Sequence, residues 1–238
     1  MNTPKYDVTC SYNKQIARDI WEFALTKPEG FTFEPGQFVL FDVPAPDDPS
    51  DMQTRAFSIA SSPGEDELLF VAKILPGGRA SVWITDTIKE GSTVSLQGPF
   101  GRFLLNTETK NDYLFICTST GNAPFRSQII HSLQGGEKRR MDLIYGVRSE
   151  DRFFWVEEFE ALAKKYENFH LHLSLSDPHE DWSKYHGRVQ VVIEEVVADF
   201  STKNIYICGH PDMTNDVKKL CLEDWGVEKG ELHVEGYI

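Results

Sequence analysis

Residues 113–133 read YLFICTSTGNAPFRSQIIHSL, and this stretch decides the fold. The letters YLFIC are apolar throughout, as expected for a strand that is buried on both faces of a sheet. Small residues follow, and the remaining letters predict a helix from about Ala123 to Leu133. A buried strand, a loop of small residues and a helix are typical of a nucleotide-binding unit, because the loop lets a phosphate approach the helix N-terminus.

Strands and helices continue to alternate after this unit, which predicts a doubly wound parallel α/β sheet. FHLHLSL (169–175) alternates polar and apolar letters, so we expect it toward an edge of that sheet. A helix in 152–166 would bring four apolar residues to one face: Trp155, Phe159, Leu162 and Tyr166. The other expected strands are MDLIYGV (141–147), NIYICG (204–209) and ELHVEGYI (231–238), and the other expected helices lie in 189–200 and 212–226.

Upstream of this region, up to about Leu105, short apolar segments are cut by Gly and Pro. Such dense turn signals predict an antiparallel β-barrel or sandwich. One helix is expected within ASVWITDTI (80–88), and the polar letters LNTETKND (105–112) read as a joint. We therefore expect two domains, a β-barrel over residues 1–106 and an α/β domain over residues 107–238.

Composition and charge narrow the class of protein. The chain has 238 residues, of which 40% are hydrophobic and 26% charged, as in ordinary globular proteins. The formal charge of −13 argues against nucleic acid and anionic membranes as partners. No apolar run is long enough to span a bilayer and the N-terminal letters lack a signal peptide's apolar core, so we expect a cytoplasmic protein.

Metal and disulfide chemistry have little support in the sequence. The four cysteines are scattered without a Cys-x-x-Cys pair, which speaks against a zinc ribbon or an iron–sulfur cluster in this chain. His170 and His172 form a His-x-His pair, but no third ligand lies nearby in sequence, so we assign no metal residues.

Two clusters in the first half carry groups that suit a bound cofactor. Arg55, Phe57 and Ser58 would place a phosphate clamp, a flat stacking surface and a hydroxyl donor on one side of a strand, although a solvent-facing strand with a core Phe explains the same letters. The stretch PGGRAS (76–81) leads into the expected helix, with Ser81 as a possible cap. It reads as a phosphate site at a helix N-terminus, or as a hairpin turn plus a cap.

Two further clusters lie at strand ends in the second half. CTSTGNAP (117–124) follows the buried strand, and its small residues would let a pyrophosphate approach the backbone. It matches neither a G-x-G-x-x-G fingerprint nor a P-loop. CGHP (208–211) ends the strand NIYICG, where α/β proteins bind ligands, although a buried Cys and an ordinary turn would read alike.

Together these motifs resemble those of the ferredoxin–NADP reductase superfamily, in the family's order. RAFSIASSP (55–63) is similar to the flavin-binding R-x-[YF]-S strand, and GGRAS (77–81) to the loop that binds the FAD pyrophosphate. TSTGNAPFRS (118–127) is similar to the T-G-T-G-x-A-P-x-R-S nucleotide loop, CGHPDM (208–213) to C-G-x-P-x-M, and HVEGYI (233–238) to the H-V-E-x-Y ending. The resemblance covers essentially the whole chain. It implies a stand-alone FAD-dependent NAD(P)H reductase without an iron–sulfur domain, with its active site between the two domains.

For FAD, the resemblance implies a set of residues in the first half. Arg55 would bind the pyrophosphate, with Gly78 and Ser81 supplying further donors. Phe57 would lie against the isoalloxazine, where the family often has Tyr. Ser58 would point its hydroxyl at flavin N5, the atom that receives hydride.

For the nicotinamide nucleotide, the resemblance implies that Thr120, Gly121 and Pro124 shape the pyrophosphate loop. Two letters depart from the family pattern. Ser119 replaces a Gly and Asn122 replaces an aliphatic residue, so we expect both to affect the geometry of the loop.

The resemblance also implies catalytic residues at the strand ends of the second half. Cys208 would pack beside the nicotinamide C4, and Glu235 would complete a polar relay with Ser58. Tyr237 would cover the flavin until nicotinamide displaces it. Ile238 follows the Tyr that plant-type members place last, so we expect this additional residue to weaken or redirect the stacking.

The choice of nucleotide is predicted from SLSDP (174–178). Asp177 stands where NADP-dependent relatives place a phosphate-binding Arg, so it would repel a 2′-phosphate and accept a hydrogen bond from a ribose hydroxyl. Arg148 is a basic alternative. We therefore expect NADH to be preferred over NADPH.

Three functions remain open from the sequence. The first is electron transfer from NAD(P)H through FAD to a ferredoxin, flavodoxin or similar acceptor, by a protein expected to be a monomer. The others are reduction of free flavin and non-catalytic electron transfer. Basic candidates for docking an acidic acceptor are Lys138–Arg140, Lys218–Lys219, Arg79 and Arg102, each of which also reads as a solvated face.

Overall fold

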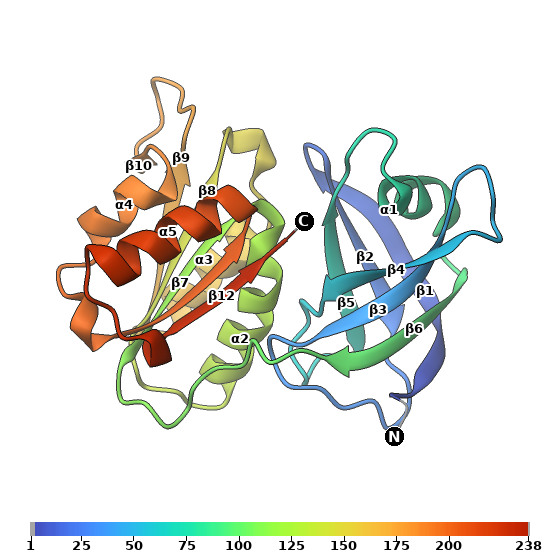
Figure 1. Ribbon diagram of the computed structural model, residues 1–238, viewed down its shortest axis with the longest axis horizontal. Coiled ribbons are helices and arrows are strands. Elements are labelled where there is room, and N and C mark those ends of the chain that lie inside the picture. Colours follow the sequence, from blue (N-terminus) through green and yellow to red (C-terminus); the bar gives the residue numbers. More distant parts are fainter. Residues whose placement is uncertain (1–2, 238) are drawn as a thin grey trace. The chain divides into compact units, whose positions relative to one another are not determined.

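A computed structural model describes residues 3–237, which form two compact units (Figure 1). The first unit comprises Met1–Leu105 with Ala123–His131, and the second comprises Asn106–Asn122 with Ser132–Ile238. The predicted fold class, an antiparallel β domain with a parallel α/β domain, is confirmed. The division of the chain after residue 106 stays a prediction, since a segment from the second half belongs to the first unit.

The first unit contains a six-stranded antiparallel sheet in the order β4-β3-β6-β1-β2-β5. Its two outer strands come together just beyond β4, where the Ala60 amide donates to the Leu69 carbonyl at 2.8 Å, so the sheet curls into a barrel. The strands are β1 (Lys5–Ala17), β2 (Ile20–Thr26), β3 (Phe38–Pro44), β4 (Met52–Ser58), β5 (Glu67–Lys73) and β6 (Thr93–Phe100).

Aromatic rings fill the interior of this barrel. The Phe23 ring stacks on Phe70 with centroids 5.2 Å apart, and Phe41 meets Phe70 edge-on at the same separation. Trp83 closes the cluster against Phe41 at 5.4 Å. Because such rings bury large areas and hold fixed relative orientations, they make a rigid base for the strands around them.

The helix expected in residues 80–88 differs from the prediction. α1 (Arg79–Val82) is only four residues long and continues as a π-helical turn over Trp83–Thr87. Ser81 lies inside α1 and is not its N-cap; its hydroxyl accepts a hydrogen bond from the Leu75 amide at 2.8 Å. The cap position is taken by Gly78, where a Cβ would lie only 3.2 Å from the Leu75 carbonyl oxygen.

The second unit contains a six-stranded parallel sheet in the order β10-β9-β8-β7-β11-β12. Successive strands run outward from β7 in one direction and from β11 in the other. The strand order therefore reverses between β7 and β11, the place where doubly wound sheets bind ligands. The strands are β7 (Asp112–Thr118), β8 (Met141–Val147), β9 (Phe169–Leu175), β10 (Tyr185–His186), β11 (Lys203–Gly209) and β12 (Leu232–Gly236).

Helices cover the faces of this sheet. α4 (Val189–Val196) and α5 (Pro211–Glu223) lie on one face, where their apolar residues join Leu114, Ile144 and Ile207 in one core (Figure 1). α3 (Val156–Lys165) packs on the opposite face, with the Phe159 and Phe169 rings 6.4 Å apart.

The beginning and end of α3 differ from the sequence prediction. Trp155 is the N-cap with a left-handed φ of 59°, and Tyr166 is the C-cap, so neither lies on the helical face predicted to carry them. Phe159, inside the helix, is fully buried as expected. The apolar spacing was right, but the turn that starts the helix rotates Trp155 away from it.

The strand β9 lies near the edge of the sheet, as predicted. The two-residue β10 pairs with it only at Ser174 and Leu175. Its His172 is used internally, since Nε2 lies 2.9 Å from the Asp142 carboxylate. Within residues 3–237 there is no cluster of three or more His, Cys, Asp or Glu side chains suited to a metal ion. None of the helices in that range is both long enough and apolar enough to cross a membrane.

Candidate functional site

The carboxyl ends of three parallel strands form a candidate nucleotide site in the second unit. Cys208 on β11 is in register with Cys117 on β7 and with Glu235 on β12. The chain leaves β7 after Thr118 and enters a 3₁₀ turn over Ser119–Asn122, while β11 ends at Gly209. The loop TSTGN and the strand end CG, predicted from the sequence as separate clusters, therefore lie side by side.

Two glycines make this close approach possible. A Cβ on Gly121 would lie 2.3 Å from the Cys208 carbonyl oxygen and 2.7 Å from the Gly209 Cα. A Cβ on Gly209 would lie 2.5 Å from the Thr118 Oγ1, and its φ of +139° suits glycine. Because both contacts are with backbone or with a short side chain, any larger residue would push the two strand ends apart.

The turn after β7 leads directly into α2 (Ala123–Gln134), with Pro124 in the first turn of the helix. The Thr118, Ser119 and Thr120 side chains are partly exposed, whereas Gly121 is buried. Proline has no amide hydrogen and suits a helix start, and the remaining free amides of the first turn attract anions. The arrangement can hold a phosphate, as predicted for Thr120, Gly121 and Pro124, whose binding roles stay predictions.

Ser119, the departure from the family's glycine, keeps the backbone conformation that glycine favours. Its φ is +51°, a left-handed value that is uncommon for residues with a side chain. The Ser substitution therefore preserves the path of the loop and introduces local strain of about 1 kcal/mol.

Asn122 replaces an apolar family residue with a buried amide. Its side chain is 0% exposed, and neither its Oδ1 nor its Nδ2 has a hydrogen-bond partner among the described residues. An unpaired buried amide costs about 1–3 kcal/mol. This residue is the least satisfied polar group of the candidate site.

Cys208 is fully buried between its neighbouring strands. Burial raises the pKa of its thiol well above the ordinary value, and the Glu235 carboxylate raises it further, while a hydrogen bond with the Tyr237 side chain opposes the rise. The thiol is therefore protonated at neutral pH and suits packing or hydrogen-bond donation, not nucleophilic attack.

Tyr237 follows β12, and its amide donates to the Gly209 carbonyl at 2.9 Å. Its side chain and the Glu235 carboxylate thus lie at the same strand ends as Cys208. The predicted role of Tyr237 over a flavin and the relay from Glu235 to Ser58 stay predictions. Ile238, predicted to influence the Tyr237 side chain, lies outside the described residues.

The predicted flavin residues of the first unit lie along β4. Arg55 and Phe57 are two residues apart and therefore lie on the same face of β4. Ser58 directly follows Phe57 and points to the other face, so the three do not share a side as the sequence predicted. The Phe57 ring packs against Phe41 at 5.5 Å and stays partly exposed. Phe57 is thus partly a core residue, and Ser58 is 8% exposed.

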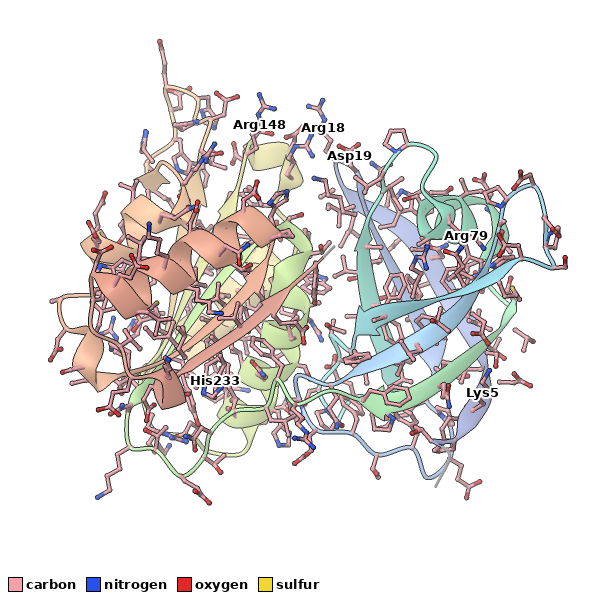
Figure 2. All side chains as sticks on the ribbon, viewed as in Figure 1. Lys5, Arg18, Asp19, Arg79, Arg148 and His233 are labelled. Atoms are coloured by element: carbon pink, nitrogen blue, oxygen red, sulfur yellow. The ribbon has the colours of Figure 1, made fainter. Side chains whose placement is uncertain are left out.

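Arg55 is available to a phosphate in the first unit. Within the described chain its guanidinium hydrogen-bonds to nearby acceptors on its own strand, the Thr54 carbonyl at 2.9 Å and the Gln53 Oε1 at 2.8 Å. By contrast Arg79, labelled in Figure 2, is occupied, since its guanidinium binds the carboxylate and the carbonyl of Asp51 at 2.5 Å each. That ion pair ties α1 to the loop between β3 and β4.

The residues present fit the two cofactors that the motifs imply. In the first unit a partly exposed Arg and a half-exposed aromatic lie on β4, and a separate glycine turn opens α1. In the second unit the two glycines let the turn after β7 pack closely against the end of β11, and this turn runs directly into the start of α2, where free amides suit a phosphate.

The residues predicted to select the nucleotide lie at the ends of β8 and β9. The Asp177 amide donates to the Arg148 carbonyl at 2.9 Å, and the Arg148 Nε lies 3.7 Å from the Asp177 carboxylate. Both side chains are exposed, at 75% for Arg148 (labelled in Figure 2) and 70% for Asp177. Arg148 and Asp177 are therefore neighbours, and their opposite charges partly neutralise each other.

Sequence reasoning assigned no role to three consecutive polar residues of α2 that are buried in the first unit. Arg126, Ser127 and Gln128 donate to the backbone carbonyls of Ala60, Ser61 and Phe103, at 2.9, 2.7 and 2.6 Å respectively. The letters FRSQ (125–128) place three polar residues in a row on the helix, so at least one of them must turn toward the protein. Buried polar side chains have hydrogen-bond partners, so this run indicates a polar contact with another segment.

Comparison with known families matches a cofactor-binding domain to each half of the chain. Residues 8–104 match the oxidoreductase FAD-binding domain, and residues 115–219 match the oxidoreductase NAD-binding domain. The chain belongs to the ferredoxin–NADP reductase superfamily. The matches place one cofactor domain on the barrel and the other on the parallel sheet, as the motifs predicted.

Individual members of the superfamily show the extent of the likeness. The electron transfer component of toluate 1,2-dioxygenase from Pseudomonas putida is 32% identical over 205 residues, covering 86% of this chain and 59% of that protein. Ferredoxin–NADP reductase B of Sorangium cellulosum is 29% identical over 225 residues, covering 91% of each. The crystal structure of a cytochrome P450 reductase from Amycolatopsis has a TM-score of 0.86 at 26% identity, covering 99% of this chain and 71% of that one.

The chain spans 59% of the length of the Pseudomonas relative.

Proposed function

We propose that this chain is an FAD-dependent oxidoreductase that takes hydride from NADH and passes electrons to a redox partner protein. The observation that carries the proposal is the junction of β7, β11 and β12, where Gly121 and Gly209 let the turn after β7 pack directly against the end of β11, beside the protonated thiol of Cys208. A site at a reversal of strand order, with the start of a helix facing it, suits a dinucleotide.

Bound FAD would supply the redox chemistry, as it accepts an electron pair as hydride and releases single electrons. Arg55 would pair with its pyrophosphate, and the turn at Gly78 and Ser81 would add donors. Phe57 would offer the exposed part of its ring to the isoalloxazine. Ser58 would donate its hydroxyl hydrogen to N5, the atom that gains the hydride.

On the nucleotide side, residues at the strand ends would orient the nicotinamide. Thr120, Gly121 and Pro124 would hold the pyrophosphate at the start of α2. Cys208 keeps its proton because burial and the neighbouring Glu235 raise its pKa, so it would present a small neutral group to the nicotinamide ring. Positioning of donor and acceptor atoms supplies most of what a protein adds to hydride transfer.

The test of this function uses the purified full chain. FAD is expected to stay with the protein through gel filtration, and anaerobic addition of NADH is expected to bleach its visible absorbance. Loss of the flavin on the column would favour the reduction of free flavin. Retention of FAD without bleaching by NADH or NADPH would favour a non-catalytic role in electron transfer. Either result would overturn the proposal.

The preference for NADH rests on Asp177. Its carboxylate lies beside the guanidinium of Arg148 and reduces the positive charge that a 2′-phosphate would need. Steady-state kinetics with both nucleotides are expected to give a higher kcat/KM for NADH. A higher kcat/KM for NADPH would reverse the assignment.

A ferredoxin or a flavodoxin is the proposed class of acceptor, and the name of the Sorangium relative supports the ferredoxin. All four cysteines of the 238 residues are buried and free, and none forms a Cys-x-x-Cys pair, so a one-electron cluster would lie outside these residues. Of the basic candidates for docking, Arg139 and Arg140 bind Glu137 and Asp142 within the second unit, and therefore form no free basic patch. NADH-driven reduction of candidate ferredoxins and flavodoxins tests this assignment.

A further inference from the structure

The segment that follows Ser58 is held by side chains of α2. Arg126 is only 6% exposed, and its guanidinium grips the Glu65 carboxylate with two parallel contacts of 3.0 Å, Nη1 to Oε2 and Nη2 to Oε1. The same Nη1 donates to the Ala60 carbonyl at 2.9 Å. One residue further along the helix, the Ser127 hydroxyl donates to the Ser61 carbonyl at 2.7 Å.

The rest of this segment is fixed from within the barrel. The Ile59 amide donates to the Gln37 carbonyl at 2.9 Å, and the Ser62 amide donates to the Glu65 carboxylate. Glu65 thus closes the loop onto itself while Arg126 clamps it from outside. Because Ala60 is only two residues beyond Ser58, the clamp constrains the backbone from which the Ser58 hydroxyl projects.

A purely structural role would not require this pair. The Arg126 side chain is 8% exposed and the Glu65 side chain 36%, so the pair is buried on the Arg126 side. Withdrawing that charge from water is costly, and apolar residues of similar volume often stabilise a protein as well as a buried ion pair does. A planar guanidinium that makes two parallel bonds fixes direction as well as distance, which a point charge such as Lys does not. The arrangement therefore suits a place where backbone orientation matters.

We propose that Arg126, together with Glu65, is a positioning residue that sets the orientation of the Ser58 hydroxyl for hydride transfer. The inference rests on the proposed function, because it assumes that Ser58 acts at the flavin N5. It adds that α2 contributes to the flavin site through Arg126 and Ser127, in addition to its expected contact with the nucleotide phosphates.

The decisive experiment is a double-mutant cycle on the full-length holoprotein, using Arg126→Lys, Ser58→Ala and the double variant. Arg126→Lys is expected to slow the reduction of bound FAD by NADH about tenfold in stopped flow, since small displacements of an aligned group are costly. The FAD content and the KM for NADH are expected to change less than about twofold, because neither depends on the aligned hydroxyl. In the Ser58→Ala background the same change is expected to have no further effect, because the group being positioned is gone.

Arg139→Lys is the matched control. Arg139 is also mostly buried, pairs with Glu137 at 2.5 Å and donates to the Thr109 carbonyl at 2.6 Å, but it belongs to the second unit, whereas Ser58 belongs to the first. It is expected to lower the melting temperature as much as Arg126→Lys does and to leave the rate of flavin reduction unchanged. Two results would overturn the inference. One is that Arg126→Lys and Arg139→Lys slow flavin reduction equally; the other is that Arg126→Lys slows it as much in the Ser58→Ala protein as in the protein that keeps Ser58.

A second readout does not depend on turnover. With FAD labelled with ¹⁵N at N5, Arg126→Lys is expected to move the N5 resonance in the same direction as Ser58→Ala does. An unmoved resonance would overturn the inference. If Arg126→Lys does not fold, Glu65→Gln takes its place, since it keeps the side-chain shape and removes the charge that Arg126 grips. Wild-type protein that binds FAD but is not reduced by NADH would refute the proposed function, and the N5 resonance would then decide the inference on its own.

Discussion

Gly121→Ala would test the geometry of the strand ends. The new Cβ would lie 2.3 Å from the Cys208 carbonyl oxygen, whereas ordinary contacts begin at 3.4 Å, so the end of β11 must retreat by about 1 Å. Overpacking of this kind costs about 1–3 kcal/mol of unfolding free energy. Because Cys208 moves with its carbonyl, a displacement of about 1 Å is expected to slow hydride transfer roughly 100-fold.

Two measurements on the Gly121→Ala protein separate these effects. Urea unfolding followed by tryptophan fluorescence gives the loss of free energy, and anaerobic stopped flow gives the rate at which NADH bleaches the flavin. The FAD content is expected to stay at the wild-type level, since the proposed FAD residues on β4 and at the start of α1 lie in the first unit.

Gly230→Ala is the control, because a Cβ at Gly230 meets nothing within 4 Å. Its unfolding free energy is expected to stay within about 0.5 kcal/mol of wild type, with an unchanged rate. A Gly121→Ala protein with wild-type stability and wild-type reduction by NADH would show that the two strand ends do not meet as described.

Three other changes test single features of the second unit. Ser119→Gly relieves a left-handed φ and is expected to raise the unfolding free energy in urea by about 0.5 kcal/mol, while Ser119→Val should lower it. Asn122→Leu replaces an unpaired buried amide by an apolar group of similar shape, and a gain of about 1 kcal/mol is expected in the same assay; a loss would mean that the amide has a partner. Hydrogen bonds from the Arg139 side chain lower the pKa of Glu137 to about 2, so its stabilisation is present above its usual pKa of 4.5 and lost as the pH falls toward 2. Glu137→Gln should therefore cost about 1 kcal/mol at pH 7, and urea unfolding over a pH series should show the difference vanish in acid.

Local patterns predicted the regular elements of the second unit well. The letters MDLIYGV and FHLHLSL correspond to β8 and β9 residue for residue, and α2 begins at Ala123 as expected. In each of these segments the apolar residues are either continuous or regularly spaced over several positions. The preferred backbone conformation and the buried face therefore predict the same element. The prediction failed where a turn sets the outcome, at Trp155 before α3 and at Ser81, which lies inside α1 and is not its cap.

Contacts between distant segments could not be predicted in the same way. The letters around Gly121 indicated a phosphate loop, but nothing local shows that this glycine faces the carbonyl of Cys208. Arg126 was visible in the motif, whereas its partner Glu65 lies 61 positions earlier in a stretch that reads as an ordinary polar turn. The chemistry of a residue is thus readable from its letters, but its partner depends on the tertiary fold.

The membership of Ala123–His131 in the first unit has a practical consequence for dissecting the protein. A fragment cut at the polar joint near residue 106 would keep every strand of the barrel but lose the donors to the carbonyls of Ala60, Ser61 and Phe103. Those oxygens would then face solvent or remain bare, beside a Glu65 without its counter-ion. An autonomous first unit would therefore need a transplanted copy of this helix, and a simple truncation at the joint would leave the segment after β4 unsupported.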